Sequence, residues 1–183
     1  MFSYRKRLFY PVYVDDPDPA FGQVLSEHYA GKDSEFSLAA QYLNHRLNIK
    51  NRYVRELLGL IAAEEMGHME MIAVAVSKLG LSMDYTSPFG EAWTSSFVDQ
   101  SRETLAILEA DIQAEERAKD LYLKHLAMAR DASLGRMIQF LIKREDVHQG
   151  LLQKACKLCK GAEVPEKFTE LIYEYKMSLQ VLE

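Results

Sequence analysis

The sequence has only two cysteines, Cys156 and Cys159, in a Cys-Lys-Leu-Cys stretch. A zinc site needs two further ligands that no second Cys-x-x-Cys supplies, so this motif by itself indicates neither a zinc site nor a redox centre. We interpret the pair as two half-buried thiols near a helix end, with a cross-link in an oxidising assembly as the alternative.

The chain also lacks an apolar run long enough to span a membrane and an apolar signal-peptide core, so we expect cytosolic synthesis without secretion. The net charge is −5, and the one basic block is Arg5-Lys6-Arg7. Nucleic-acid binding is therefore not indicated. The 183 residues, 48% hydrophobic and 27% charged, suit a single globular domain over 1–183.

The strongest positive feature is an internal repeat. Glu65-Met-Gly-His68 recurs 80 residues later as Glu145-Asp-Val-His148. A further glutamate stands thirty residues before each motif, at Glu35 and Glu115. Such a repeat predicts two similar helix pairs within one chain.

Residues i and i+3 share one face of a helix, so each Glu-x-x-His can place both side chains at one site. Two such pairs with two lone glutamates are the ligand set of a ferritin-like dimetal site. Carboxylates with a few imidazoles suit manganese or non-haem iron. The alternative, a chance Glu-x-x-His on a solvated face, is weakened by the second copy.

Both motifs fall in apolar stripes of helical period, such as Leu58, Ile61, Glu65 and Ile72 in the first copy. Buried carboxylates need partners, and four of them repel one another unless cations neutralise them. In the helix predicted over 101–130, both Glu115 and Glu116 lie near the apolar stripe, so periodicity does not decide which is the ligand. The repeat selects Glu115, which matches Glu35. We expect Glu64, beside Glu65, to point off the stripe.

Helix signals predict an all-α, ferritin-like four-helix bundle over residues 20–160. An extended aromatic arm, 1–20, precedes it and packs either on its own bundle or on a neighbouring subunit. The predicted helices run over 20–47, with an interruption near Gly31 and a cap at Asp33 or Ser34, then 52–79, 101–130 and 132–160. Residues 80–100 form the long middle crossover, and a short helix over 165–179 closes the chain.

The remaining histidines, His28, His45 and His125, have no glutamate three positions before them, so we interpret them as surface or supporting residues rather than ligands. Tyr42 and Tyr122 lie two turns beyond the lone glutamates on the same face. Their hydroxyls can hydrogen-bond the ligand carboxylates, or they are ordinary core tyrosines.

Several stretches resemble the manganese catalase family, in its short spore-coat branch of the CotJC type. They are Tyr10-Pro-Val12, Asp16-Pro-Asp-Pro19, Tyr29-Ala-Gly31 before Glu35, Ala39-Ala-Gln-Tyr-Leu-Asn44 and Glu64-Glu-Met-Gly-His-Met-Glu-Met-Ile72. The resemblance implies two manganese ions, with two iron ions as the alternative, and a hydrogen peroxide substrate. It also implies a homo-oligomer, contacts with other spore coat proteins, and a spore-coat location after synthesis in the cytoplasm.

By the same resemblance the metal ligands are Glu35, Glu65, His68, Glu115 and His148. Glu145 then stays outside the metal shell as the acid–base group, whereas the repeat alone favours a symmetric site in which it ligates. Two other functions stay open: a di-iron oxidase or peroxidase of the rubrerythrin type, and a structural coat protein with a non-catalytic metal site.

Overall fold

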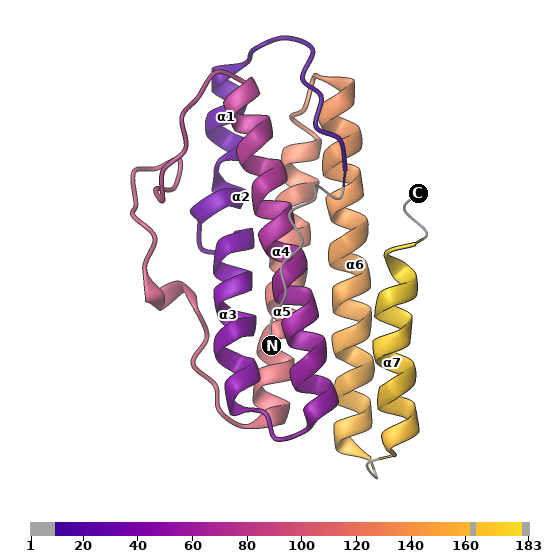
Figure 1. Ribbon diagram of the computed structural model, residues 1–183. Helices are drawn as coiled ribbons and strands as arrows, with labels where there is room; N and C mark the ends of the chain where they lie inside the picture. The colour runs from indigo at the N-terminus through magenta and orange to yellow at the C-terminus, as the bar shows by residue number, and fades with distance from the viewer. Residues whose placement is uncertain (1–9, 162–163, 181–183) are drawn as a thin grey trace.

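The computed structural model describes residues 10–161 and 164–180. The helices are α1 (Pro19–Leu25), α2 (Glu27–Ala30), α3 (Glu35–Asn48), α4 (Arg52–Lys78), the 3₁₀ helix η1 (Ser95–Phe97), α5 (Thr104–Leu126), α6 (Ala132–Lys160) and α7 (Pro165–Ser178). Figure 1 shows α3, α4, α5 and α6 side by side, with α1 and α2 stacked above α3 and with α7 beside α6.

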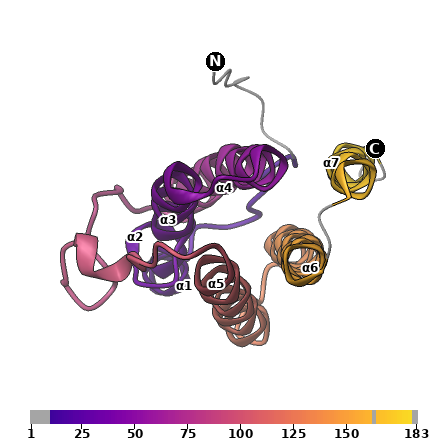
Figure 2. The same ribbon diagram turned by 90° about the horizontal axis from the view of Figure 1, so that it is seen from below.

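The topology follows from the direction of the long helices. α3 and α4 form one antiparallel pair and α5 and α6 form another: Figure 2 shows which helices are neighbours, and Figure 1 shows their directions. Since α4 and α5 run the same way, the segment between them returns along the whole bundle beside α3 (Figure 1). This long crossover confirms the predicted all-α, ferritin-like four-helix bundle. Within the described ranges, no helix is both long and apolar enough to cross a membrane.

Local sequence explains where the helices begin. The side chains of Asn51 and Asp131 accept hydrogen bonds from backbone N–H groups in the first turns of α4 and α6. Ser34 caps α3 in the same way, which decides between the two predicted caps. After α4 the chain turns at Gly80, whose φ of +100° favours glycine.

The predicted first helix is more broken than its sequence suggests. It is interrupted at Ser26 as well as at Gly31. The Gly31 N–H donates to the Glu27 carbonyl at 2.9 Å, and a Cβ at position 31 would lie 2.5 Å from that oxygen. This close approach requires glycine, and α3 begins four residues later, at Glu35.

The apolar core consists of two clusters on either side of one mid-bundle layer. One contains Leu58 and Leu152, and the other contains Ile72 and Leu141. Both glutamate–histidine motifs lie between these clusters along α4 and α6. Apolar packing above and below therefore seals the layer from solvent.

The described part of the N-terminal arm packs on its own bundle. The Tyr10 ring lies 4.9 Å from the Phe140 ring, and the Val12 carbonyl accepts a hydrogen bond from Lys78 at 2.7 Å. The Asp15 N–H donates to Asp131 at 2.7 Å. Residues 1–9, which carry the rest of the predicted arm, lie outside the described residues.

Candidate metal centre

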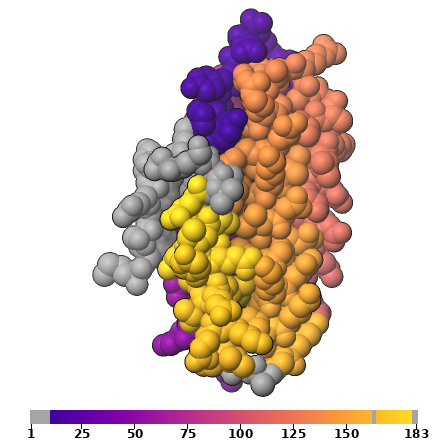
Figure 3. Space-filling view, turned by 90° about the vertical axis from the view of Figure 1, so that its right-hand side faces the viewer, coloured from indigo at the N-terminus to yellow at the C-terminus, as the bar shows by residue number. Residues whose placement is uncertain are grey.

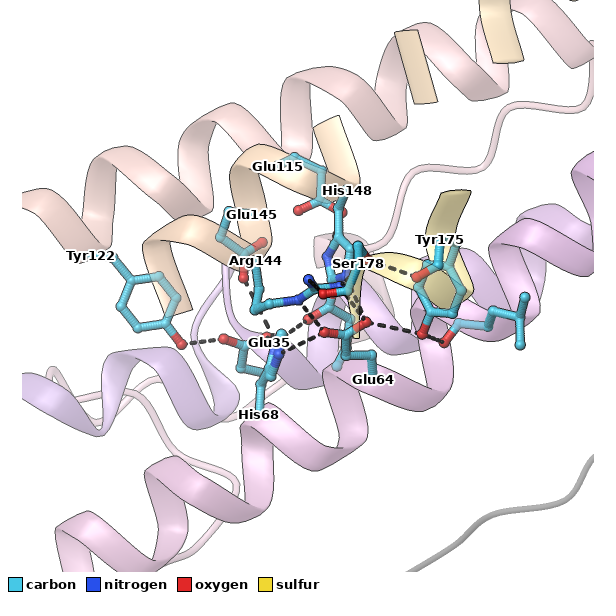
Figure 4. Close-up of polar contacts among 12 residues, drawn as sticks. Glu35, Glu64, His68, Glu115, Tyr122, Arg144, Glu145, His148, Tyr175 and Ser178 are labelled. Carbon is cyan, nitrogen blue, oxygen red and sulfur yellow. Dashed lines mark hydrogen bonds and ion pairs between the residues drawn. The ribbon is translucent and has the colours of Figure 1, made fainter. Parts of the chain in front are cut away.

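The four long helices bring the six repeat-derived residues together in the mid-bundle layer. Figure 4 labels all of them except Glu65. Glu35 comes from the first turn of α3, and the others come from the middles of α4, α5 and α6. All six are at most 1% exposed: Glu35, Glu65, His68, Glu115, Glu145 and His148. Burial of this many ionisable groups in one layer is costly unless each has a partner.

Their ligand atoms form two overlapping groups. In each group the candidate atoms lie within 4.8 Å of one another. The groups are Glu35, Glu65, His68 and Glu145, and Glu65, Glu115, Glu145 and His148. Two carboxylates, Glu65 and Glu145, belong to both, so the geometry can hold two cations side by side.

The two histidines meet Glu65 in nearly the same way. His68 Nδ1 lies 2.8 Å from one oxygen of Glu65, and His148 Nδ1 lies 2.8 Å from the other. Each Nδ1 also lies 3.6 Å from a lone glutamate, Glu35 for His68 and Glu115 for His148. Both rings therefore turn Nδ1 toward Glu65 and the lone glutamates, and Nε2 away from them.

The electrostatics of this layer fit a cation site. Burial and the neighbouring Glu65 carboxylate raise the pKa of Glu35 to about 8. Burial, Glu65 and Glu115 likewise raise the pKa of Glu145 well above its usual value. Within the described residues, one oxygen of Glu35, one of Glu115 and both of Glu145 have no hydrogen-bond donor. Bound metal ions would satisfy these oxygens and neutralise the carboxylates.

Tyr42 and Tyr122 contact the lone glutamates crosswise. The Tyr42 hydroxyl on α3 donates to Glu115 on α5, and the Tyr122 hydroxyl on α5 donates to Glu35 on α3. The expected contact between these hydroxyls and the carboxylates is therefore present. The repeat places both tyrosines correctly, but it does not reveal that each serves the other helix pair.

The expectation that Glu64 points off the stripe needs a correction, because this side of α4 is buried as well. Glu64 is 1% exposed, and Arg144 donates to it through Nε at 2.5 Å and through Nη2 at 3.2 Å. A single buried stripe on α4 would leave Glu64 exposed, whereas Tyr175 of α7 also covers the helix on the Glu64 side. One signal was present in the sequence, because the 80-residue repeat pairs Glu64 with a residue of opposite charge, Arg144.

The other histidines are buried rather than superficial. His45 Nδ1 lies 2.8 Å from Asp111, and His28 Nε2 lies 2.9 Å from His125 Nδ1. The His28 ring stacks on Tyr122 with centroids 3.6 Å apart. Burial lowers the pKa of His125 to about 4. These histidines are outside both ligand groups, and they support the tyrosines and helices around the site.

The two cysteines lie on α6, Cys156 buried and Cys159 half-buried. Cys156 packs with the cluster that contains Leu152 and Phe168. Neither cysteine belongs to a ligand group among the residues that the structure covers.

Solved structures share this fold. A crystal structure of KatB, a manganese catalase from Anabaena, aligns with a TM-score of 0.84 and 24% identity, covering 90% of this chain and 84% of KatB. A bacterioferritin from Desulfovibrio desulfuricans aligns with a TM-score of 0.67 and 19% identity, covering 83% of this chain and 86% of that chain. At these identities the likeness concerns the fold.

Sequence relatives carry the family assignment. Protein CotJC of Bacillus subtilis is 33% identical over 181 residues, covering 87% of this chain and 95% of that protein. The probable manganese catalase of Clostridium acetobutylicum is 29% identical over 184 residues, covering 88% of this chain and 82% of that protein. The family model for manganese-containing catalases matches residues 1–86 and 79–183. The chain therefore belongs to the manganese-containing catalase family.

Proposed function

We propose that this protein is a dimanganese catalase that converts two molecules of hydrogen peroxide to one of oxygen and two of water. The observation that carries the proposal is the pair of overlapping ligand groups, buried in one layer and joined through Glu65 and Glu145. Membership of the manganese-containing catalase family supports manganese as the metal.

In this proposal Glu35, Glu65 and His68 hold one ion, and Glu65, Glu115 and His148 hold the other. The contacts that support it are those of Glu65, whose two oxygens each lie 2.8 Å from one histidine Nδ1. A carboxylate placed between two ligand sets can bridge two ions. Two bound manganese ions supply a two-electron exchange, because each ion changes by one electron.

Glu145 takes the role of acid and base. Both of its oxygens are buried without a hydrogen-bond donor in the described ranges, and the imidazole nitrogen His68 Nδ1 is 3.7 Å away. Oxidation of one peroxide to oxygen releases two electrons, which the bound manganese ions would take up, and two protons; Glu145 accepts one of these protons and water takes the other. Both protons return when the oxygen–oxygen bond of the second peroxide breaks and two water molecules form. Its raised pKa suits a group that must hold a proton between the two steps.

Tyr42 and Tyr122 orient the lone glutamates during this cycle. Each hydroxyl donates to one carboxylate oxygen and leaves the second oxygen of Glu115 or Glu35 for the metal. Such hydrogen bonds fix the orientation of a ligand and tune its basicity.

The position of Glu145 in both groups also favours a second candidate function. If Glu145 ligates as Glu65 does, the site is symmetric, as in di-iron oxidases and peroxidases of ferritin-like fold. The same preparation loaded with iron or with manganese tests this alternative.

We further propose a place in the spore coat, in a homo-oligomer and in contact with other coat proteins. The support is the 33% identity to protein CotJC of Bacillus subtilis. Fluorescent fusion protein evenly distributed in non-sporulating cells would contradict this location.

Oxygen evolution from hydrogen peroxide tests the activity itself. The metal-free protein is reconstituted with manganese or with iron, and oxygen is followed with an electrode. We expect rapid evolution with manganese only. No evolution by a fully loaded manganese protein would contradict the catalase function, and peroxide consumption only with iron would favour the di-iron candidate.

A further inference from the structure

A buried charged network lies directly behind the two candidate histidine ligands (Figure 4). Glu64 stands at its centre. One Glu64 oxygen lies 3.1 Å from His148 Nε2, and the other lies 3.5 Å from His68 Nε2. A single carboxylate thus faces the outer nitrogens of both imidazoles.

The chemistry of imidazole gives this contact a direction. A neutral imidazole that offers the Nδ1 lone pair to a metal carries its proton on Nε2. That proton then needs an acceptor, and Glu64 is the carboxylate that lies within ion-pair distance of Nε2 in both rings. Glu64 is 1% exposed, so no bulk water competes for the role.

Arg144 balances the charge of Glu64. It is 1% exposed, and it donates to both Glu64 oxygens through Nε and Nη2. A side-on pair of this kind fixes the carboxylate plane as well as its charge. Glu64 and Arg144 occupy equivalent positions of the internal repeat. Their ion pair therefore links α4 of the first half to α6 of the second half.

The last helix completes the network. Tyr175 of α7 donates its hydroxyl proton to Glu64 at 2.9 Å. Arg144 also donates to the backbone oxygen and the hydroxyl of Ser178, at 3.2 and 3.1 Å. Figure 3 shows α7 lying along α6 on the surface of the molecule. The side chains on its inner face therefore reach the residues that back the ligand layer.

We propose that Glu64 is a positioning residue for His68 and His148, and that Tyr175 of α7 holds Glu64 in place. This inference rests on the proposed metal ligation by the two histidines and adds the residues that orient them. It makes α7 a functional part of the metal centre rather than only a cover for α6.

The test compares manganese affinity in folded protein. Glu64→Gln keeps the side-chain shape but removes the charge, and its matched control is Glu56→Gln, on the exposed face of the same helix. Metal-free protein is titrated with manganese well below its melting temperature, and bound manganese is followed by its paramagnetic resonance spectrum. We expect affinity to fall about 10- to 100-fold in Glu64→Gln, with an altered spectrum of the bound ions, and to stay unchanged in the control.

Tyr175→Phe is the second variant, because loss of the Glu64 charge beside buried Arg144 can prevent folding. Its control is Tyr173→Phe, on the exposed side of α7. We expect a smaller loss of manganese affinity in Tyr175→Phe and none in the control. Wild-type affinity and spectrum in folded Tyr175→Phe, or in folded Glu64→Gln, would overturn this inference alone. Absence of manganese binding by the wild-type protein would overturn the metal centre itself.

Discussion

Replacement of Glu35 by glutamine should change stability in opposite directions with and without metal. The raised pKa of Glu35, about 8, means that the folded protein holds this proton more tightly than the unfolded chain does. The stability that the protonated carboxyl contributes is complete below a pH of about 4.5 and is lost as pH rises toward 8. Since one pKa unit corresponds to about 1.4 kcal/mol, the loss is about 3 kcal/mol at pH 7.

Glutamine resembles the protonated acid and does not titrate. Its oxygen can still accept the Tyr122 hydrogen bond. Without metal, Glu35→Gln should therefore be more stable than wild type at pH 7 by up to about 3 kcal/mol, with little difference near pH 4.5. With manganese the order should reverse, because the amide is a poorer ligand than the carboxylate.

Urea unfolding followed by circular dichroism measures both effects, in chelator and in excess manganese, at several pH values. Glu116→Gln is the matched control, since Glu116 is the exposed neighbour of Glu115 on α5. A metal-free Glu35→Gln protein that is less stable than wild type at pH 7 would refute the proposed proton on Glu35. An equal loss of stability in both proteins between pH 4.5 and 8 would refute it as well.

Three further predictions concern single side chains. Glu145→Gln should keep both manganese ions and lose about 10²- to 10⁴-fold in turnover, as expected for an acid–base group; metal content and oxygen evolution check this, and loss of metal in step with activity would favour the symmetric site. His148→Ala should lose at least one ion per chain, because alanine has no nitrogen ligand; elemental analysis showing full occupancy would remove His148 from the ligand set. Phe168→Ala, which truncates a 1% exposed side chain of α7, should cost about 3–5 kcal/mol in urea unfolding; a cost below about 1 kcal/mol would mean that α7 is not stably docked.

The long helices could be predicted from the sequence because their signals are local. The helical period of the apolar residues predicts α4 and α6. Their first turns follow the caps Asn51 and Asp131, and the chain turns after α4 at Gly80. The break at Ser26 was missed, since serine ends a helix only in a suitable context. α5 ends at Leu126 rather than near Arg130, where the chain turns before the Asp131 cap.

The ligand layer could be predicted because the repeat supplies long-range information. Equal spacing of Glu35 and Glu115 before the two motifs indicates that all of them face one site, and the structure brings them together. Periodicity could not place Glu64, because a residue beside the stripe is exposed or buried according to a helix much further along the chain. Tyr175 of α7 makes the contact that buries Glu64, and no residue near Glu64 in the sequence predicts it.

The buried histidines show the same limit. His45 and His125 occupy equivalent repeat positions, yet His45 pairs with Asp111 and His125 with His28. These partners are set by how the two helix pairs face each other. Spacing along one helix does not contain that information.

The number of manganese ions in the folded chain tests the dinuclear centre most directly. Protein grown or reconstituted with manganese, freed of loose metal and analysed for elemental content, should contain two manganese ions per chain. Two ions would agree with ligand groups that overlap at Glu65 and Glu145. One ion per chain, or only trace metal after reconstitution, would contradict the dinuclear centre.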